Sequence, residues 1–345
     1  MLEERKAEHL SINLDEDVSF PYLTTGLERY RFTHNALPDL DLREIDLGTT
    51  FLGKDLQIPL LISSMTGGTA EARRINHHLA EGAQEAGIAL GLGSLRAALE
   101  SPRLADTFHI RHLAPDILLF ANLGAAQLNT GFGLSECQRA VDMVDADALI
   151  LHLNPLQEAL QEDGDTDWKG LLGKIEAVCH GLDVPVVAKE VGWGISAGVA
   201  RQLVDVGVSV IDVAGAGGTS WSQVEMYRAP TERRRRLCAA FSDWGIPTAE
   251  ALISVRTTLP ETPIIISGGL RSGMDLAKGL ALGADLGGLA GPFLEAANDS
   301  AQAGAELADE MGSVLRTTLF SLNIPDVESL KGTPALRLSD PAPCP

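Results

Sequence analysis

Cysteine is scarce in this chain, and its few occurrences are scattered. No two of them are spaced as a Cys-x-x-Cys pair, and three fall in segments expected to be helical. This spacing argues against a disulfide framework and against a structural zinc site. We therefore expect reduced, packed thiols and a cytoplasmic protein. The four cysteines are Cys137, Cys179, Cys238 and Cys344.

Basic residues and long apolar runs are also in short supply. The 345 residues include 27 Lys and Arg against 47 Asp and Glu, a formal net charge of −20. Nucleic acid is not an expected partner, because no broad basic face can neutralise its phosphates. No apolar run approaches the roughly 18–20 residues that span a membrane, and the first residues lack the apolar core of a signal peptide. We expect no membrane partner either.

Short apolar runs recur from residue 59 onwards, separated by amphipathic stretches with a helical period. Near-continuous apolar character is typical of parallel strands covered on both faces. Eight strand–helix units over about 235 residues match a (β/α)8 barrel of the α/β class. A doubly wound sheet usually carries a GxGxxG turn after its first strand, and this sequence has none there. The runs are Pro59–Met65, Ile88–Gly93, Ile117–Leu123, Ala148–Leu153, Val184–Glu190, Val208–Ala214, Pro263–Gly268 and Leu286–Gly291.

This barrel divides the chain into three expected parts: an N-terminal arm with a barrel-bottom segment (1–58), the barrel (59–322) and a C-terminal tail (323–345). Residues 51–58 predict a short hairpin that closes the bottom of the barrel, and residues 297–322 predict a single last helix.

Two insertions interrupt the pattern. The acidic stretch 157–167 is expected to be flexible. The stretch 219–244 carries four consecutive arginines (233–236), which favour a solvated helix face over an anion collector.

Two consecutive glycine turns occur between Pro263 and Phe293. The first follows a β-branched run at Gly268-Gly269, and the second follows the next strand at Ala290-Gly291. Backbone N–H groups beside a helix N-terminus bind anions, and the loops after strands 7 and 8 frequently form the phosphate site of such barrels. The pattern predicts a phosphate site here, although tight turns alone would also explain the glycines.

Polar residues gather where the other strands end, which is where barrels of this kind carry their chemistry. Lys189 ends a buried strand and needs an anionic partner, either a bound cofactor or the neighbouring Glu190. Arg96 suits bidentate phosphate recognition. Glu158 is a single carboxylate of the kind that holds Mg²⁺ together with substrate phosphates, although a solvated loop residue fits equally. His152 and Asn154, two apart, point to the same side of their strand.

These motifs, taken together, resemble the type 2 isopentenyl-diphosphate isomerases, a flavin-dependent family. The resemblance covers nearly the whole chain, and the segments at 5–9, 151–158 and 188–196 are the most specific. Leu95 departs from the family pattern, which usually has Gln before the arginine. The segments are RKAEH (5–9), FTHNALP (32–38), PLLISSMTGG (59–68), GLGSLR (91–96), ANLGAAQ (121–127), LHLNPLQE (151–158), AKEVGWGIS (188–196), DVAGAGGTSW (212–221), ISGGLRSG (266–273) and LAGPF (289–293).

The resemblance implies a reversible 1,3-allylic isomerisation of isopentenyl diphosphate to dimethylallyl diphosphate. It implies reduced FMN, with NADPH as the usual reductant, and Mg²⁺ at Glu158. It implies that Gln157, His152 and Lys189 take part in catalysis. Substrate contacts would come from Arg5, Lys6, His9, Ser94, Arg96, His152, Asn154 and Gln157. FMN contacts would come from Ser64, Met65, Thr66, Ser94, Asn122, Lys189, Thr219, Gly268, Gly269, Arg271, Ala290 and Gly291.

Two further expectations concern the N-terminal arm and the oligomeric state. Arg5, Lys6 and His9 form a basic patch that by itself favours a solvated terminal helix, but the resemblance makes it a lid or a contribution from a neighbouring subunit. The arm and the long last helix favour a homo-oligomer, either a tetramer or an octamer.

Two alternative functions remain open. One is an FMN-dependent 2-hydroxy-acid oxidase or dehydrogenase, which would require a histidine at the ends of strands 6 or 7. The other is a non-catalytic oligomeric barrel.

Overall fold

The structure of the protein, a computed structural model, describes residues 2–339, and of residues 2–5 and 7 the backbone alone. Eight parallel strands close a barrel in the order β10-β11-β4-β5-β6-β7-β8-β9. This confirms the expected (β/α)8 architecture, and each strand lies inside the run that predicted it except β6, which extends one residue further, to Gly124. The strands are β4 (Leu60–Ile62), β5 (Ala89–Gly91), β6 (Leu119–Gly124), β7 (Ala148–Leu153), β8 (Val186–Glu190), β9 (Val210–Asp212), β10 (Ile264–Ser267) and β11 (Leu286–Leu289).

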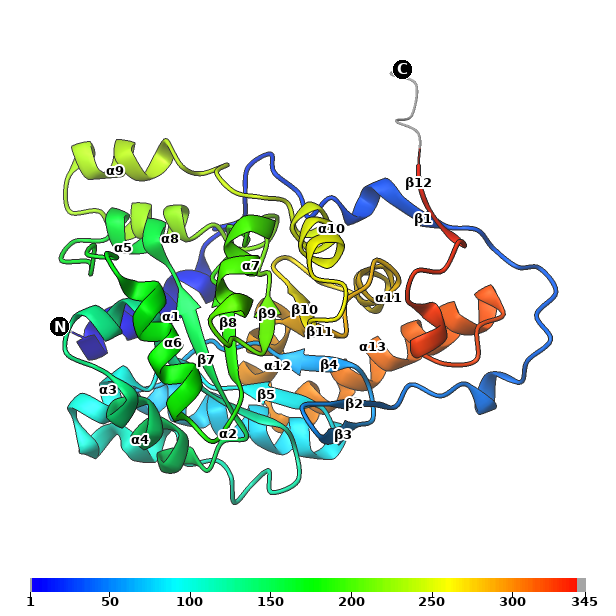
Figure 1. The fold of residues 1–345 in the computed structure, drawn as a ribbon, viewed down its shortest axis with the longest axis horizontal. Coiled ribbons are helices and arrows are strands. Elements are labelled where there is room, and N and C mark those ends of the chain that lie inside the picture. The colour runs from blue at the N-terminus through cyan, green and yellow to red at the C-terminus, as the bar shows by residue number, and fades with distance from the viewer. Residues whose placement is uncertain (1, 340–345) are drawn as a thin grey trace.

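Helices surround the barrel and cover its outer face (Figure 1). They are α1 (Leu2–Asp15), α2 (Ala70–Ala86), α3 (Arg96–Glu100), α4 (Leu134–Val144), α5 (Pro155–Leu160), α6 (Leu171–Gly181), α7 (Ala197–Asp205), α8 (Trp221–Arg228), α9 (Glu232–Ala239), α10 (Thr248–Thr258), α11 (Gly273–Ala281), α12 (Gly291–Asp299) and α13 (Ala301–Leu322). Short 3-10 helices occur at Leu27–Arg29, Leu42–Glu44, Pro102–Thr107, Ala125–Asn129 and Glu328–Leu330. In the described residues, no helix is long and apolar enough to cross a membrane.

Local sequence explains where these helices begin and end. At the start of α2, the side chain of Thr69 accepts a hydrogen bond from Ala72 N, and the helix ends at Gly87, whose φ is 63°. A hydroxyl N-cap and a left-handed glycine are the usual signals at the two ends of a helix. Ser272 and Asp275 form a reciprocal capping box on α11. Both helices are therefore fixed by their own sequence as well as by packing.

The expected single helix over 297–322 is two helices, α12 and α13. Ser300 separates them: its backbone is extended (φ −160°, ψ 167°), and its side chain accepts a hydrogen bond from Ala303 N. A serine that caps a new helix competes with continuation of the old one. Helical spacing would place Val199 on the same face of α7 as the buried Leu203, but Val199 is 43% exposed.

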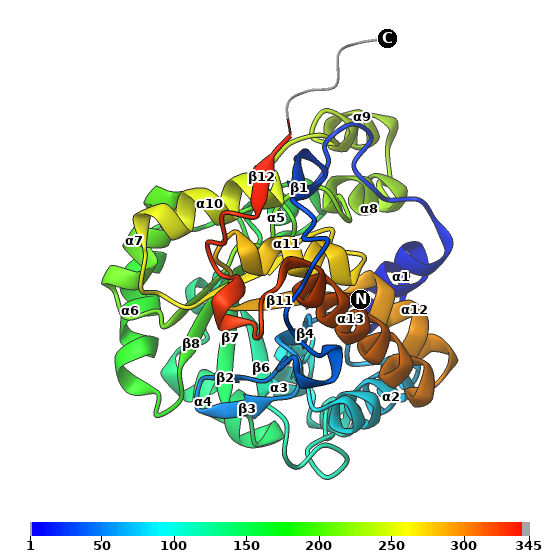
Figure 2. The ribbon, with the colours of Figure 1, turned by 90° about the vertical axis from the view of Figure 1, so that its right-hand side faces the viewer.

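A hairpin of β2 (Thr49–Phe51) and β3 (Lys54–Leu56) closes the bottom of the barrel, as predicted. Phe51 and Leu56 belong to the same buried cluster as inward-facing strand residues such as Leu61, Phe120 and Ile265. Figure 2 shows the hairpin in front of the barrel when the molecule is viewed from this end. A second small sheet joins distant parts of the chain, because β1 (Tyr30–Phe32) pairs antiparallel with β12 (Leu336–Leu338).

The insertion 219–244 forms α8 and α9, whereas the insertion 157–167 is helical only up to Leu160, the end of α5. Arg233, Arg235 and Arg236 are exposed on α9, which agrees with the predicted solvated face. Arg234 differs, because its Nη1 donates to the carbonyl of Leu160 at 3.2 Å. The acidic insertion after β7 is packed rather than loose over part of its length, as the contacts of Asp165 show below. The cysteines in the described part of the chain lie in α4, α6 and α9, away from strand ends, and are free thiols.

Candidate functional site

A layer of polar residues lies directly above the apolar floor of the barrel. Side chains of a strand face the barrel interior at every second position, so the inward residues two steps beyond the floor can be read from the register. Floor residues such as Phe120, Ile150 and Val187 are followed by Asn122, His152 and Lys189. Around the barrel this layer consists of Ser63, Gly91, Asn122, His152, Lys189, Asp212, Ser267 and Gly288. The carboxyl end of the barrel therefore has a polar layer above its apolar core, and we call this layer the polar floor.

Two carboxylates surround Lys189 without forming a direct ion pair in the described residues. Its ammonium donates to the backbone carbonyl of Glu190 at 2.6 Å. The Glu190 carboxylate instead accepts backbone N–H groups of residues 191–194. Asp212, paired in register with Lys189, is fully buried and accepts from Ser267 Oγ at 2.6 Å. The structural Lys189–Glu190 ion pair considered from the sequence is thus not formed.

Several buried polar atoms in this layer or directly after it in the chain have no hydrogen-bond partner among the described residues. They include Oγ of Ser63 and of Ser64, and Oδ2 of Asp212. Burial raises the pKa of Asp212, against the lowering effects of Lys189 and of the Ser267 hydrogen bond. An unsatisfied buried polar group is costly, so the layer is built to meet a polar ligand.

His152 is a neutral ring in this layer. Its Nδ1 lies 2.8 Å from Oδ1 of Asn122. Burial, with Lys189 and Lys6 nearby, lowers the pKa of His152 to about 3. Gly124 leaves room for the ring, since a Cβ there would lie 2.9 Å from Nε2 of His152. His152 is therefore a hydrogen-bonding group and not a cation at neutral pH.

Glycine backbone from two neighbouring loops is packed in direct contact on one side of the mouth. A Cβ on Gly268, whose φ is 97°, would lie 2.1 Å from the carbonyl oxygen of Gly215. A Cβ on Gly269, with φ 79°, would lie 2.6 Å from Gly217. No side chain fits at these positions, so the loops after β9 and β10 present bare backbone. The two predicted residues Gly268 and Gly269 thus pack against Gly215 and Gly217. We call these four residues the glycine cradle.

The N-terminal arm covers this cradle, which the sequence did not indicate. Ser19 forms an isolated antiparallel bridge with Thr219. The N–H of Phe20 donates to the carbonyl of Gly218 at 3.3 Å, and the N–H of Ser220 donates to Val18 at 2.8 Å. The arm thereby fixes the loop that carries Thr219, one of the residues expected to bind cofactor.

The remaining residues expected to hold cofactor line the same mouth. Ser64, Met65 and Thr66 follow β4, and the glycine at 93 is required because a Cβ there would lie 2.4 Å from the carbonyl oxygen of Thr66. Ala290 is the N-cap of α12, with Gly291 at its first turn. Arg271 is exposed at the rim, where its Nη2 lies 3.4 Å from Ser19 Oγ.

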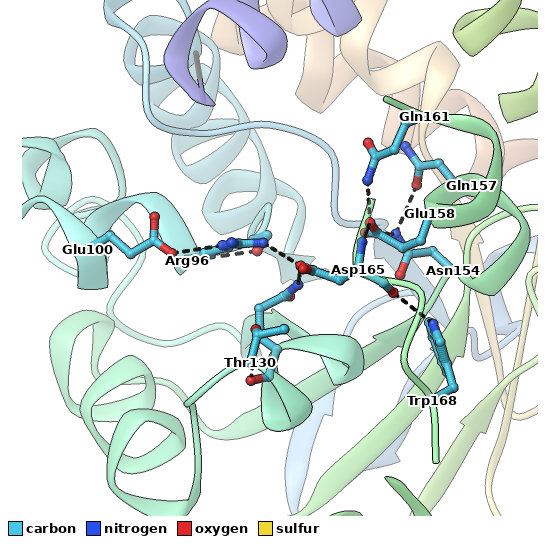
Figure 3. Close-up of polar contacts among 11 residues, drawn as sticks. Arg96, Glu100, Thr130, Asn154, Gln157, Glu158, Gln161, Asp165 and Trp168 are labelled. Carbon is cyan, nitrogen blue, oxygen red and sulfur yellow. Dashed lines mark hydrogen bonds and ion pairs between the residues drawn. The ribbon is translucent and has the colours of Figure 1, made fainter. Parts of the chain in front are cut away.

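Glu158 lies on the opposite rim in a shell of neutral donors. It is 7% exposed, so it is not a solvated loop residue. Its Oε1 accepts from Asn154 Nδ2 at 2.8 Å, and its Oε2 accepts from Asp165 N at 2.7 Å and from the Gln161 amide. Oδ1 of Asn154 is buried with no partner in the described part of the chain. An oxygen acceptor is therefore left over beside this carboxylate (Figure 3).

Arg96 opens α3 beside this group and is held by two acidic residues. Its Nε donates to Glu100 Oε1 at 2.8 Å, and its Nη1 donates to Asp165 Oδ2 at 2.8 Å (Figure 3). Gln127 also donates to the same Asp165 oxygen, at 3.1 Å. Asp165 was missed from the sequence because it lies in the insertion that was expected to be flexible.

Gln157 is linked to a buried, charged network that the sequence also missed. Its amide Nε2 donates to Glu225 Oε1 at 3.3 Å. The same oxygen lies 3.1 Å from His9 Nε2, while Glu225 Oε2 pairs with Arg228 at 2.8 Å. Burial acts to raise the pKa of Glu225, but the contacts with His9, Arg228 and Gln157 hold it below its usual range. Glu225 is therefore the ionised partner of the amide.

Helix α1 places two of the predicted basic residues at the mouth. In Figure 1 it lies on the side of the barrel where α5 and α8 lie, away from the bottom hairpin. Lys6 Nζ donates to the carbonyl of Ser94 at 2.9 Å and lies 5.3 Å from the centre of the Phe108 ring. His9 packs edge-on against Trp221 at 5.2 Å between ring centroids. The side chain of Arg5 lies outside the described residues.

Every expected site residue with a described side chain thus lies at or near one mouth. The polar floor spans the whole barrel, the glycine cradle lies on one side of the mouth, and Lys6, His9, Arg96 and Glu158 lie at the rim. Residues missed from the sequence are Ser63, Asp165, Asp212, Glu225 and Ser267. Within residues 2–339, excluding the side chains of 2–5 and 7, no group of three or more His, Cys, Asp or Glu is arranged to hold a metal ion.

Comparison with known proteins agrees with this geometry. The sequence profile of the FMN-dependent dehydrogenases matches residues 1–102 and 136–336. Solved structures share the fold at low identity. A flavocytochrome b2 superposes with a TM-score of 0.71 and 19% identity, over 96% of this chain and 83% of that one. A mandelate oxidase gives a TM-score of 0.68 and 19% identity, over 98% of each chain.

Curated relatives are far more similar in sequence. Proteins named isopentenyl-diphosphate delta-isomerase are 55% identical in Nostoc sp., over 96% of this chain and 95% of that protein, and 52% identical in Stutzerimonas stutzeri, over 97% of each. The one from Rickettsia rickettsii is 55% identical over 86% of each chain. The chain therefore belongs to the isopentenyl-diphosphate delta-isomerases, a family of isomerases built on the FMN-dependent dehydrogenase fold.

Proposed function

We propose that this protein converts isopentenyl diphosphate to dimethylallyl diphosphate, reversibly, in a site that holds reduced FMN and Mg²⁺. The observation that supports it most directly is that one barrel mouth carries two kinds of polar group. Its floor and the glycine cradle suit a flat ligand that carries a phosphate. Its rim carries Lys6, Arg96 and Glu158, which suit a diphosphate and its metal ion.

The residues present fit FMN. The unpartnered Ser63, Ser64 and Asp212 atoms offer hydrogen bonds to a polar ring, and Lys189 offers a positive charge at the floor. The glycine cradle offers backbone N–H groups to a phosphate. FMN would be held by Ser64, Met65, Thr66, Ser94, Asn122, Lys189, Thr219, Gly268, Gly269, Arg271, Ala290 and Gly291. When bound, reduced FMN supplies an electron-rich ring that stabilises positive charge on an adjacent substrate.

The rim residues would bind the substrate's charged end. The substrate would contact Arg5, Lys6, His9, Ser94, Arg96, His152, Asn154 and Gln157, and Glu158 would hold the Mg²⁺ that neutralises charge on the diphosphate. The neutral state of His152 limits its part to hydrogen bonding through Nε2, since Nδ1 is engaged by Asn122. Helix α1 would exclude water from the closed site.

Isomerisation adds one proton to the allyl unit and removes another. Gln157 is an amide and does not exchange protons at neutral pH. It would orient the substrate, while its partner Glu225 is the nearest ionised group along the hydrogen-bond chain. Lys189 would stabilise negative charge on the bound cofactor. We further propose NADPH as the flavin reductant, a homo-oligomer that is a tetramer or an octamer, and a cytoplasmic location.

The test is an NMR assay in D₂O with isopentenyl diphosphate, Mg²⁺ and reduced FMN. We expect dimethylallyl diphosphate with deuterium incorporated from solvent. Flavin reduction by a lactate-like 2-hydroxy acid, without allylic product, would instead identify an oxidase or dehydrogenase. A colourless protein that binds no FMN would identify a barrel without this chemistry.

A further inference from the structure

Asp165 lies between the two side chains assigned above to the diphosphate and to Mg²⁺. Its Oδ2 accepts from Arg96 Nη1 at 2.8 Å and from Gln127 Nε2 at 3.1 Å. Its backbone N–H donates to Glu158 Oε2 at 2.7 Å. One residue therefore contacts both the guanidinium and the carboxylate, through different atoms (Figure 3).

The contacts of Arg96 fix its plane and leave one nitrogen for a ligand. Glu100 engages Nε, and Asp165 engages Nη1. No hydrogen bond from Nη2 is found among the described residues, and the side chain is 28% exposed. A guanidinium that is already ordered loses less conformational entropy when it binds an anion than a free one does. The pair of carboxylates thus orders the guanidinium and leaves Nη2 for a ligand.

Asp165 is itself rigidly held. Its carbonyl accepts from Trp168 Nε1 at 3.0 Å. The turn before it depends on the backbone of two residues. Asp163 is left-handed, with a φ of 57°, and Gly164 packs so closely that a Cβ there would lie 1.8 Å from the carbonyl oxygen of Glu158. Only glycine permits this close approach. The segment 163–168 is therefore a fixed strap that carries Asp165 to its place.

We propose that Asp165 is a positioning residue that sets Arg96 and Glu158 in register for a metal-bound diphosphate. The proposal rests on the proposed function for the identity of that ligand. Two opposite effects are at issue. Asp165 adds negative charge beside an anion site, which by itself weakens binding. It also immobilises the arginine and the metal carboxylate, which strengthens binding, and we assign the larger effect to this second role.

The test uses the FMN-loaded full chain and measures binding of inorganic pyrophosphate with Mg²⁺ by calorimetry. We expect Asp165→Ala to weaken binding about tenfold and Asp165→Asn, which keeps an acceptor oxygen, to weaken it less. Glu162→Gln is the matched control. Glu162 is exposed, and this substitution removes one negative charge three residues before Asp165. We expect this control to bind like the wild type. With isopentenyl diphosphate, KM should rise for Asp165→Ala while kcat changes little.

A double-mutant cycle with Arg96→Gln provides the discriminating measurement. If Asp165 acts through Arg96, Asp165→Asn will have almost no further effect in the Arg96→Gln protein. Additive effects, or tighter binding in Asp165→Asn alone, would overturn the proposal, the latter by showing that Asp165 competes with the ligand. Thermal unfolding checks that each variant is folded, and Asp165→Asn carries the test if Asp165→Ala is not.

The outcome separates this inference from the proposed function. A wild type that binds Mg²⁺–pyrophosphate in an Asp165-dependent manner, yet makes no allylic product, would refute the isomerisation and leave the positioning role intact. A wild type that isomerises, with Asp165→Asn indistinguishable from Glu162→Gln, would refute the positioning role alone.

Discussion

Nδ1 of His152 and Oδ1 of Asn122 are 2.8 Å apart across the neighbouring strands β7 and β6. An amide oxygen only accepts hydrogen bonds, so Nδ1 carries the proton and Nε2 is left as an acceptor. Burial, with Lys189 and Lys6 nearby, lowers the pKa of His152 to about 3, which keeps the ring neutral. This pair therefore fixes both the tautomer and the charge of the residue at the centre of the floor.

This neutral histidine should make the protein less stable in mild acid. The pKa of His152 is lower in the folded state than the value of about 6.5 expected for the unfolded chain. The unfolded state therefore takes up the proton first as pH falls, and the stabilising contribution is lost between about pH 6.5 and 3. From this one group we expect a loss of about 2 kcal/mol between pH 7 and pH 5.

Urea unfolding of the wild type and of His152→Gln at both pH values measures this loss. The variant should show a pH difference smaller by about the same amount, since glutamine does not titrate. Equal pH differences in the two proteins would show that His152 is not the group responsible.

Asp212 should tune the charge that Lys189 presents to a bound flavin. Replacing Asp212 with Asn removes negative charge from the layer, so the anionic reduced cofactor becomes more favourable. We expect the reduction potential of bound FMN to rise by about 30 mV or more, which corresponds to about 1.4 kcal/mol for two electrons. Spectroelectrochemical titration measures it. Ser267→Ala is the control, because it removes the 2.6 Å hydrogen bond to Asp212 without removing a charge; an equal rise in this control would count against the charge argument.

Gly269 should be essential for cofactor retention, and Gly53 provides a control with the same backbone. Both have a φ of 79°, but a Cβ on Gly269 would meet Gly217 backbone at 2.6 Å, while nothing lies within 4 Å of one on Gly53. Both alanine variants pay about 1 kcal/mol for the left-handed conformation. Only Gly269→Ala should also lose FMN, measured by flavin absorbance after gel filtration. Retention of FMN by Gly269→Ala would mean that the cradle does not bind the phosphate.

Glu158→Gln should abolish the dependence on Mg²⁺ together with most of the activity, because an amide is a poor ligand for this ion. FMN content should not change, since Glu158 lies on the opposite rim from the glycine cradle. Activity as a function of Mg²⁺ concentration provides the measurement, with Glu162→Gln as the control in the same segment. An unaltered Mg²⁺ dependence in Glu158→Gln would remove Glu158 from the metal site.

Much of this site could be predicted because barrel strands follow simple periodicities. The eight apolar runs located the strands, and strand ends located Lys189, His152 and Asn154. Ser63, Asp212 and Ser267 were missed although a signal existed. Each lies two residues beyond an inward apolar residue (Leu61, Val210 and Ile265), and the period of two in a strand places it on the same face.

Other features had no local signal. Asp165 and Glu225 lie in insertions whose composition resembles solvated loops, and only tertiary contacts with Arg96 and His9 bury them. The break at Ser300 was hidden because an apolar helical pattern continues on both sides of it. Val199 is apolar and at helical spacing from the buried Leu203, yet it is 43% exposed, which periodicity alone does not indicate.

The plug of Phe51 and Leu56 at the base of the barrel has a kinetic consequence. Because Phe51 and Leu56 fill the lower end of the barrel, we expect ligands to enter and leave at the carboxyl end, above the polar floor. In the proposed site a flavin on that floor would lie beneath the diphosphate ester. Release of the product would then precede release of the cofactor.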